Sequence, residues 1–188
     1  MRIIAGVAKG RRLKTLRGYD IRPTPEKVRE SLFNRLGDLR GRRFLDGFAG
    51  SGAVGIEALS RGASRVVFVE SDRRARRCVE ENLGRVGFSE EEGSIWTILP
   101  MALVRAVAYL EKEGEAFDLI FLDPPYRTEA GLVALKRLAG SPLLVGGGRL
   151  FWEHAVSEEI EVAEKTGWRV VDTRRFGDTK VTELAGSG

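Results

Sequence analysis

Two short stretches of this chain hold residues whose types and spacing could do chemistry. One runs from Leu45 to Gly55 and contains Asp46 and the turn Gly50-Ser51-Gly52. The other is Asp123-Pro124-Pro125-Tyr126, in which two prolines separate an acid from an aromatic residue. Ligands of open α/β sheets bind at the carboxyl ends of parallel strands. If both stretches end neighbouring strands, we expect one to hold a cofactor and the other to hold the group that is modified.

The first stretch matches the G-x-G-x-x-G nucleotide-binding pattern, and Glu70 follows Gly50 by 20 residues. An acid at that spacing binds ribose hydroxyls, but the pattern alone does not separate NAD from S-adenosyl-L-methionine. Asp46 lies just before the turn, where a carboxylate disfavours a pyrophosphate and favours a cationic ammonium or sulfonium. We therefore predict S-adenosyl-L-methionine as the cofactor. A tight turn without a ligand and an NAD-linked oxidoreductase remain the alternatives.

The second stretch predicts a stiff loop that binds an amine. Each proline fixes φ at about −65° and lacks a backbone donor. The loop therefore presents acceptors, the Asp123 carboxylate and the Pro124 carbonyl, and Tyr126 offers a flat face for a base. Such a loop could accept both N–H bonds of an exocyclic amine and turn the nitrogen lone pair toward a methyl sulfonium. Positioning of this kind supplies much of the rate of a displacement.

The elements around these stretches alternate between apolar strands and amphipathic helices. This pattern predicts an α/β fold with a mostly parallel, seven-stranded sheet, helices on both faces and a C-terminal antiparallel hairpin. The expected strands include residues 43–46, 65–70, 94–99, 117–122 and 148–153, and the hairpin pairs 168–172 with 180–184. One expected helix follows Thr24, a good N-cap, and carries Arg29 on its flank. The others cover 53–60, the residues that Asp72 would cap, 103–110 and 129–138.

The N-terminal residues are strongly basic. Residues 1–43 hold 13 Lys and Arg against 4 Asp and Glu, whereas the remainder holds 18 against 23. We expect residues 1–20 to form a small β-hairpin extension and residues 21–188 to form the main domain. The cations of the hairpin, Arg11, Arg12 and Lys14 among them, suggest a polyanionic partner such as RNA. A charge-protected edge and a solvated, heat-adapted surface are the alternatives.

Other features narrow the class of protein. The single cysteine, Cys78, lies on an apolar helical stripe and is expected to be a core residue, which also argues against a cysteine-rich metal site. His154 is expected to be an ordinary surface or turn residue. The chain shows neither a run of about 20 apolar residues nor a secretory signal, so a cytoplasmic location is expected.

Several segments together carry a resemblance to a known family. The Asp-Pro-Pro-Tyr loop and the Asp-x-x-x-Gly-Ser-Gly turn look like those of class I, Rossmann-like, S-adenosylmethionine-dependent amino-methyltransferases. Five segments resemble those of the RsmD family and occur in the same order: Met1–Gly6, Arg22–Thr24, Val28–Asn34, Phe48–Gly52 and Phe176–Thr179. Members of that family methylate the exocyclic N2 of a guanine in bacterial 16S rRNA. The resemblance covers nearly the whole chain.

The resemblance implies roles for individual residues. Glu70 would bind the ribose, and Ser71, Asp72, Met101 and Ala102 would lie near the adenine. Asp123, Pro124 and Tyr126 would hold the guanine amine, with Arg22 and Thr24 closing the site. The residues that would line the methionine side are Asp46, Phe48, Ala49, Gly50, Ser51 and Gly52. The chain departs from the family at Leu99–Ala102, where the usual polar residue before the alanine is Met101.

The implied partner is 16S rRNA, in a small-subunit assembly particle, and the implied protein is a monomer with neither a membrane nor a metal partner. Two other functions remain open. One is an amino-methyltransferase of adenine or cytosine in DNA or RNA, although a short chain leaves little room for a DNA-recognition domain. The other is a non-catalytic RNA-binding assembly factor.

Overall fold

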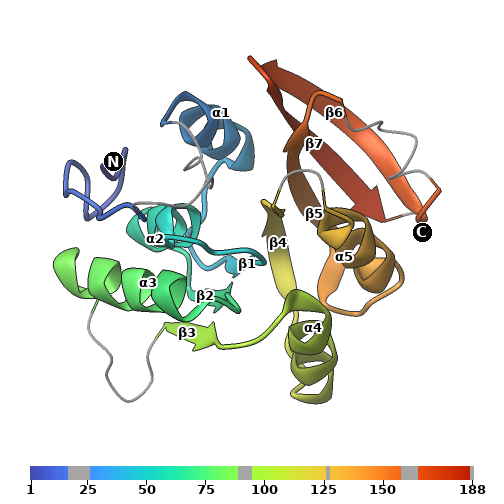
Figure 1. Ribbon diagram of the computed structural model, residues 1–188, viewed down its shortest axis with the longest axis horizontal. Coiled ribbons are helices and arrows are strands. Elements are labelled where there is room, and N and C mark those ends of the chain that lie inside the picture. The colour runs from blue at the N-terminus through green and yellow to red at the C-terminus, as the bar shows by residue number, and fades with distance from the viewer. Residues whose placement is uncertain (17–25, 89–94, 126–127, 158–164, 187–188) are drawn as a thin grey trace. The chain divides into compact units, whose positions relative to one another are not determined.

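The computed structural model describes residues 1–16, 26–88, 95–125, 128–157 and 165–186 (Figure 1). Arg22, Thr24 and Tyr126 therefore lie outside the described residues. The helices are α1 (Glu26–Leu36), α2 (Ala53–Ser60), α3 (Arg73–Arg85), α4 (Leu103–Lys112) and α5 (Ala130–Leu138). The strands are β1 (Arg43–Asp46), β2 (Arg65–Val69), β3 (Trp96–Leu99), β4 (Phe117–Leu122), β5 (Leu144–Ala155), β6 (Trp168–Phe176) and β7 (Thr179–Gly186).

The strands of these ranges form one seven-stranded mixed sheet in the order β3-β2-β1-β4-β5-β7-β6. Pairing is parallel between β1 and β2, between β2 and β3, and between β4 and β5. It is antiparallel between β7 and both of its neighbours. The predicted fold class, a mostly parallel sheet with helices and a C-terminal antiparallel hairpin, is confirmed.

The first of two compact units spans Met1–Met101. Its strands are buried apolar runs, including Phe44, Leu45 and residues 66–69, as expected for a parallel sheet covered by helices. α2 packs on β1 and β2. Asp72 caps α3 by accepting the N–H groups of Arg74 and Ala75, as predicted. Cys78 is buried on α3, which confirms it as a core residue, and burial raises the pKa of its thiol.

Residues 1–16 form the N-terminal arm. The arm packs more closely against the rest of the unit than the predicted hairpin extension implied. An isolated antiparallel bridge joins Arg2 to Arg12, and Ile3, Ala8 and Leu13 are buried. Gly6 has φ +83°, and a Cβ there would lie 1.7 Å from the Ser60 carbonyl oxygen. Only glycine allows this approach. The predicted boundary at residue 20 stays a prediction.

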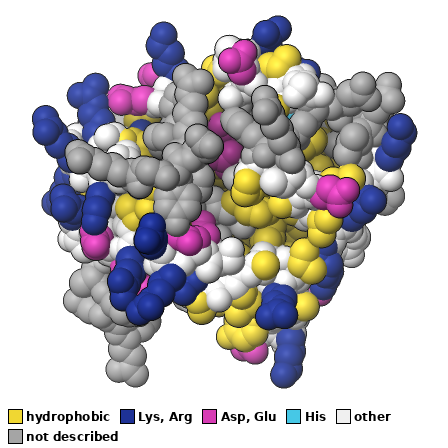
Figure 2. All heavy atoms as spheres, in the orientation of Figure 1, with side chains coloured by type: hydrophobic (Ala, Val, Ile, Leu, Met, Phe, Trp, Pro, Cys, Tyr) yellow, Lys and Arg dark blue, Asp and Glu magenta, His cyan; other side chains and the backbone are white. Residues whose placement is uncertain are grey.

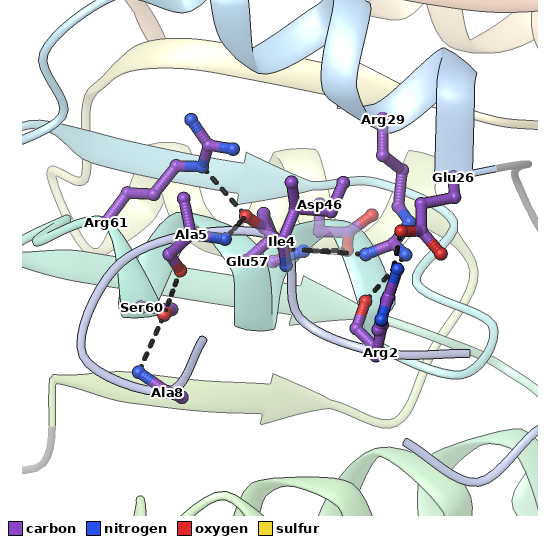
Figure 3. Close-up of polar contacts among 11 residues, drawn as sticks. Arg2, Ile4, Ala5, Ala8, Glu26, Arg29, Asp46, Glu57, Ser60 and Arg61 are labelled. Carbon is purple, nitrogen blue, oxygen red and sulfur yellow. Dashed lines mark hydrogen bonds and ion pairs between the residues drawn. The ribbon is translucent and has the colours of Figure 1, made fainter. Parts of the chain in front are cut away.

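A buried carboxylate anchors the arm to the unit (Figure 3). Glu57 of α2 accepts hydrogen bonds from the backbone N–H groups of Ile4 at 2.8 Å and Ala5 at 3.0 Å. It also accepts one from Nε of Arg61 at 2.8 Å, and its Oε2 lies 3.5 Å from Nη1 of Arg29. Both Glu57 and Arg29 are fully buried. Unlike a surface ion pair, this charge has no water to replace a lost partner.

Arg29 differs from its prediction. The sequence places it on the flank of its helix, but the structure buries it, and its Nη2 donates to the Arg2 carbonyl at 2.9 Å. Burial lowers the pKa of the guanidinium, and the Glu57 carboxylate opposes that shift. Helical periodicity puts Arg29 on the same face as Leu32 and Leu36. It cannot reveal the partners that make burial of the cation possible, because they are a carboxylate on another helix and a backbone carbonyl of the arm.

The second unit spans Ala102–Gly188, and in it α4 packs against α5 and α5 against β5. His154 lies in β5 and is fully buried, so the predicted surface or turn role is wrong. Its ring stacks on Trp152 with 4.1 Å between centroids, and its Nε2 lies 2.8 Å from Oγ1 of Thr182. Burial lowers the pKa of His154 to about 4. The strand predicted for residues 148–153 is too short. In the structure β5 continues to Ala155, because it pairs in antiparallel fashion with β7 up to that residue.

Glu57→Gln is expected to destabilise the protein by about 3–5 kcal/mol, because it leaves the buried Arg29 cation without its counter-charge. Glu26→Gln is the matched control, since it breaks an exposed pair with Arg2 and should cost about 1 kcal/mol or less. Urea denaturation measures both free energies of unfolding. Equal losses in the two variants would contradict the anchoring role of Glu57.

His154 is the single histidine of the chain, so its ring resonances in proton NMR are unambiguous. Titration of the folded protein should give a pKa of about 4. In denaturant the value should return to about 6.5. Because the folded pKa is the lower one, the neutral ring contributes stability above about pH 6.5 that is lost as the pH falls toward 4. A folded-state value near the unfolded one would show that the ring is hydrated.

Candidate active site

The turn between β1 and α2 is held closed by two carboxylates. Oδ2 of Asp46 accepts the N–H of Gly55 at 3.0 Å, which ties the end of β1 to the first turn of α2. Glu70 accepts the N–H of Gly50 at 2.9 Å through Oε2 and that of Asp72 at 2.8 Å through Oε1. Both acids predicted to bind a cofactor therefore also shape the backbone that would surround it.

Each glycine of the pattern has a distinct physical role. Gly50 and Gly52 have φ values of +53° and +78°, which side chains rarely adopt. A Cβ on Gly55 would lie 2.2 Å from the Phe68 ring, so this glycine permits close packing of α2 on β2. A Cβ on Gly50 would meet nothing within 4 Å. The turn therefore leaves open space beside its backbone, as a cofactor-binding turn requires.

The residues around this open space fit a nucleoside cofactor. Phe48, Gly50, Ser51 and Glu70 are half-buried and so remain accessible to a ligand. Each Glu70 oxygen accepts one backbone N–H and has capacity for a ribose hydroxyl as well. Asp46 and Ala49 are buried, and Gly52 packs near Val79. The predicted contact between Asp46 and a cationic group stays a prediction.

The predicted adenine end consists of residues from two loops. Ser71 is exposed, and the Asp72 carboxylate is used as the α3 cap. Met101 is half-buried and Ala102 is exposed at the start of α4, where no side chain caps the helix. The adenine roles of these residues stay predictions.

Sequence reasoning missed Asn82 on α3. Its Nδ2 donates to the Ser51 carbonyl at 2.8 Å and to the Lys14 carbonyl at 3.1 Å, and its Oδ1 accepts the Lys14 N–H at 2.7 Å. The side chain is fully buried. The sequence did hold a sign of this role, because Asn82 is a polar residue on the apolar stripe of its helix, four residues after Cys78.

The acceptor loop follows β4 in the second unit. Asp123 is half-buried, Pro124 is buried and Pro125 is exposed. Oγ1 of Thr128 donates to the Pro125 carbonyl at 2.8 Å, which fixes the outer side of the loop. Tyr126 is outside the described residues, so its stacking face stays a prediction.

Lys and Arg side chains gather over the N-terminal arm and α3 (Figure 2). Arg11 donates through Nη1 to the Val86 carbonyl, and Nζ of Lys14 lies 2.6 Å from Oε2 of the exposed Glu81. Arg12 is exposed. Part of the predicted RNA-binding charge therefore also holds the arm on α3.

Among the described helices, none is long and apolar enough to cross a membrane. In the same part of the chain, His, Cys, Asp and Glu side chains form no group of three or more that could hold a metal ion.

Known proteins match this chain over nearly its whole length. The family described as Conserved hypothetical protein 95 matches residues 1–185. The chain is 38% identical over 178 residues to the ribosomal RNA small subunit methyltransferase D of Haemophilus influenzae, covering 94% of this chain and 89% of that protein.

Solved structures show the same architecture. A hypothetical protein of Thermus thermophilus is 31% identical, with a TM-score of 0.82 and 98% of both chains covered. A candidate methyltransferase solved in complex with SAH is 16% identical, with a TM-score of 0.68 over 84% of this chain and 48% of that one, a likeness of fold alone. With the match to the methyltransferase D of Haemophilus, these findings show that the chain belongs to the RsmD family.

Proposed function

We propose that this protein transfers a methyl group from S-adenosyl-L-methionine to the exocyclic N2 amine of a guanine in bacterial 16S rRNA. The observation that carries the proposal is the Asp-Pro-Pro loop at the end of β4, in a chain of the RsmD family. The name of the Haemophilus relative supports small-subunit rRNA as the substrate. We further propose that the protein acts as a monomer, in the cytoplasm, on a small-subunit assembly particle.

The glycine turn is the proposed cofactor site. Glu70 would accept the ribose hydroxyls, and the open space beside Gly50 would admit the methionine portion. When bound, the cofactor supplies a methyl group on a cationic sulfur, which the amine nitrogen takes with its lone pair as the C–S bond breaks and a proton leaves. The buried Asp46 would favour the cationic ligand electrostatically.

The acceptor loop is the proposed guanine site. The Asp123 carboxylate and the Pro124 carbonyl would accept the two N–H bonds of the amine, and Tyr126 would stack on the base. Asp123 need not be a strong base, because the amine loses its proton after it has been methylated. Its proposed contribution is orientation, which can supply several orders of magnitude in rate.

The described structure supports the rigidity that this role demands. Gly131 of α5 lies so close to the loop that a Cβ there would be 2.9 Å from Cγ of Pro124 and 3.1 Å from Nε1 of Trp152. Pro124, Gly131 and Trp152 are all buried. The glycine therefore lets α5 approach the Pro124 ring and the Trp152 indole closely, which supports a rigid loop.

Asp123→Ala should lower methyl transfer by about 100-fold or more while the cofactor Kd stays unchanged. The assay incubates unmodified small-subunit RNA, free and protein-bound, with labelled cofactor and identifies the product by nucleoside mass spectrometry. Glu129→Ala, at an exposed acid beyond the loop, is the control. A wild-type rate in Asp123→Ala would refute its role. Methylated adenosine or cytidine would overturn the choice of guanine, and tighter binding of NAD than of the methyl donor would overturn the function.

Gly131→Ala should push Pro124 outward by several tenths of an ångström or more and lower kcat about tenfold or more, because misplacement of a binding group is costly. The cofactor Kd should stay within about twofold. Gly84→Ala is the matched control, since Gly84 is helical and its added Cβ would meet open space. Steady-state kinetics and calorimetry measure both quantities. An unchanged kcat would show that the loop tolerates the shift.

A further inference from the structure

Asn82 joins two segments that have separate proposed tasks. On one side it binds the Lys14 backbone twice, at the N–H and at the carbonyl. On the other side the same Nδ2 group donates to the carbonyl of Ser51, in the cofactor turn. Because the amide is fully buried, water cannot replace these bonds.

The turn is otherwise held by Asp46 and Glu70, which bind the N–H groups of Gly55 and Gly50. The carbonyl of Ser51, which lies between Gly50 and Gly55 in the sequence, accepts its hydrogen bond from Asn82 of α3. α3 also packs on the turn through Val79, whose Cγ1 would lie 3.0 Å from a Cβ on Gly52. A movement of Asn82 therefore moves the backbone beside the open space.

The arm is well suited to respond to RNA. The Lys14 side chain is exposed, and its ammonium pairs with the exposed Glu81 at 2.6 Å. Exposed pairs contribute little free energy, so a phosphate can displace the carboxylate. Such a contact acts on the residue whose backbone Asn82 binds.

We propose that Asn82 is a positioning residue that couples RNA binding at the arm to cofactor binding at the glycine turn. The inference rests on the proposed function. RNA held by Lys14 restricts the arm at that residue, Asn82 transmits the restriction to the Ser51 carbonyl, and the cofactor binds a turn whose remaining freedom is already reduced. Coupling of two binding equilibria is reciprocal, so the cofactor tightens RNA binding by the same factor.

The test measures the Kd of S-adenosylhomocysteine by calorimetry, with and without a saturating unmodified small-subunit RNA. In the wild-type protein, RNA should tighten this Kd about tenfold, within the usual range of coupling between sites. Asn82→Asp keeps the size and the acceptor for the Lys14 N–H but loses both donated bonds, and RNA should then tighten the Kd twofold or less. Lys14→Gln, at an exposed side chain that folding does not require, should reduce the coupling equally.

Leu83→Ala is the matched control, because it destabilises the same helix through the core and its apolar side chain cannot hydrogen-bond to either segment. It should lower the Tm and retain the tenfold effect, which a merely structural role of Asn82 would not predict. Tenfold coupling in both Asn82→Asp and Lys14→Gln would overturn the inference. A wild-type protein that methylates RNA but shows no effect of RNA on the Kd would also overturn it and leave the proposed function standing. Failure of the wild type to transfer methyl groups would instead refute the function.

Discussion

The first unit depends on the hydrogen bonds and the ion pair that the buried carboxylate of Glu57 makes. It is surrounded by two backbone N–H groups of the arm, by Nε of Arg61 and by the guanidinium of Arg29. A charge in such a place is tolerated only when all its partners are present. It therefore fixes three segments at once: the arm, α2 and, through Arg29, α1. Replacement of any partner leaves a charge in an apolar interior, which gives the arrangement its specificity.

From this anchor the hydrogen bonds continue toward the cofactor turn. The arm passes from α2 to α3, where Asn82 binds its backbone and the carbonyl of Ser51. Asp46 and Glu70 complete the turn by accepting the N–H groups of Gly55 and Gly50. Residues proposed to contact ligands are thus also structural, and they hold much of the turn in place before any ligand binds. Such preorganisation reduces the entropy that binding must overcome.

The second unit applies a different principle to the acceptor loop. Here rigidity comes from packing rather than from charge: Pro124 lies against the glycine of α5 and close to Trp152. The neighbouring His154 is kept neutral by burial and stacks on the same tryptophan. An apolar surrounding strengthens hydrogen bonds made at its border, which suits a loop whose proposed task is to accept two of them.

The sequence by itself determined the strands, the helices, the glycine turn and the Asp72 cap, because each depends on residues a few positions apart. It also determined the family and pointed to Asp123 and Glu70. Only the tertiary structure decided that Arg29 and His154 are buried and that Asn82 joins the arm to the turn. The partners of these side chains lie on other elements, which are far from them in the sequence. Periodicity reports which face of an element is apolar, whereas the pairing of buried polar groups is fixed when elements pack together.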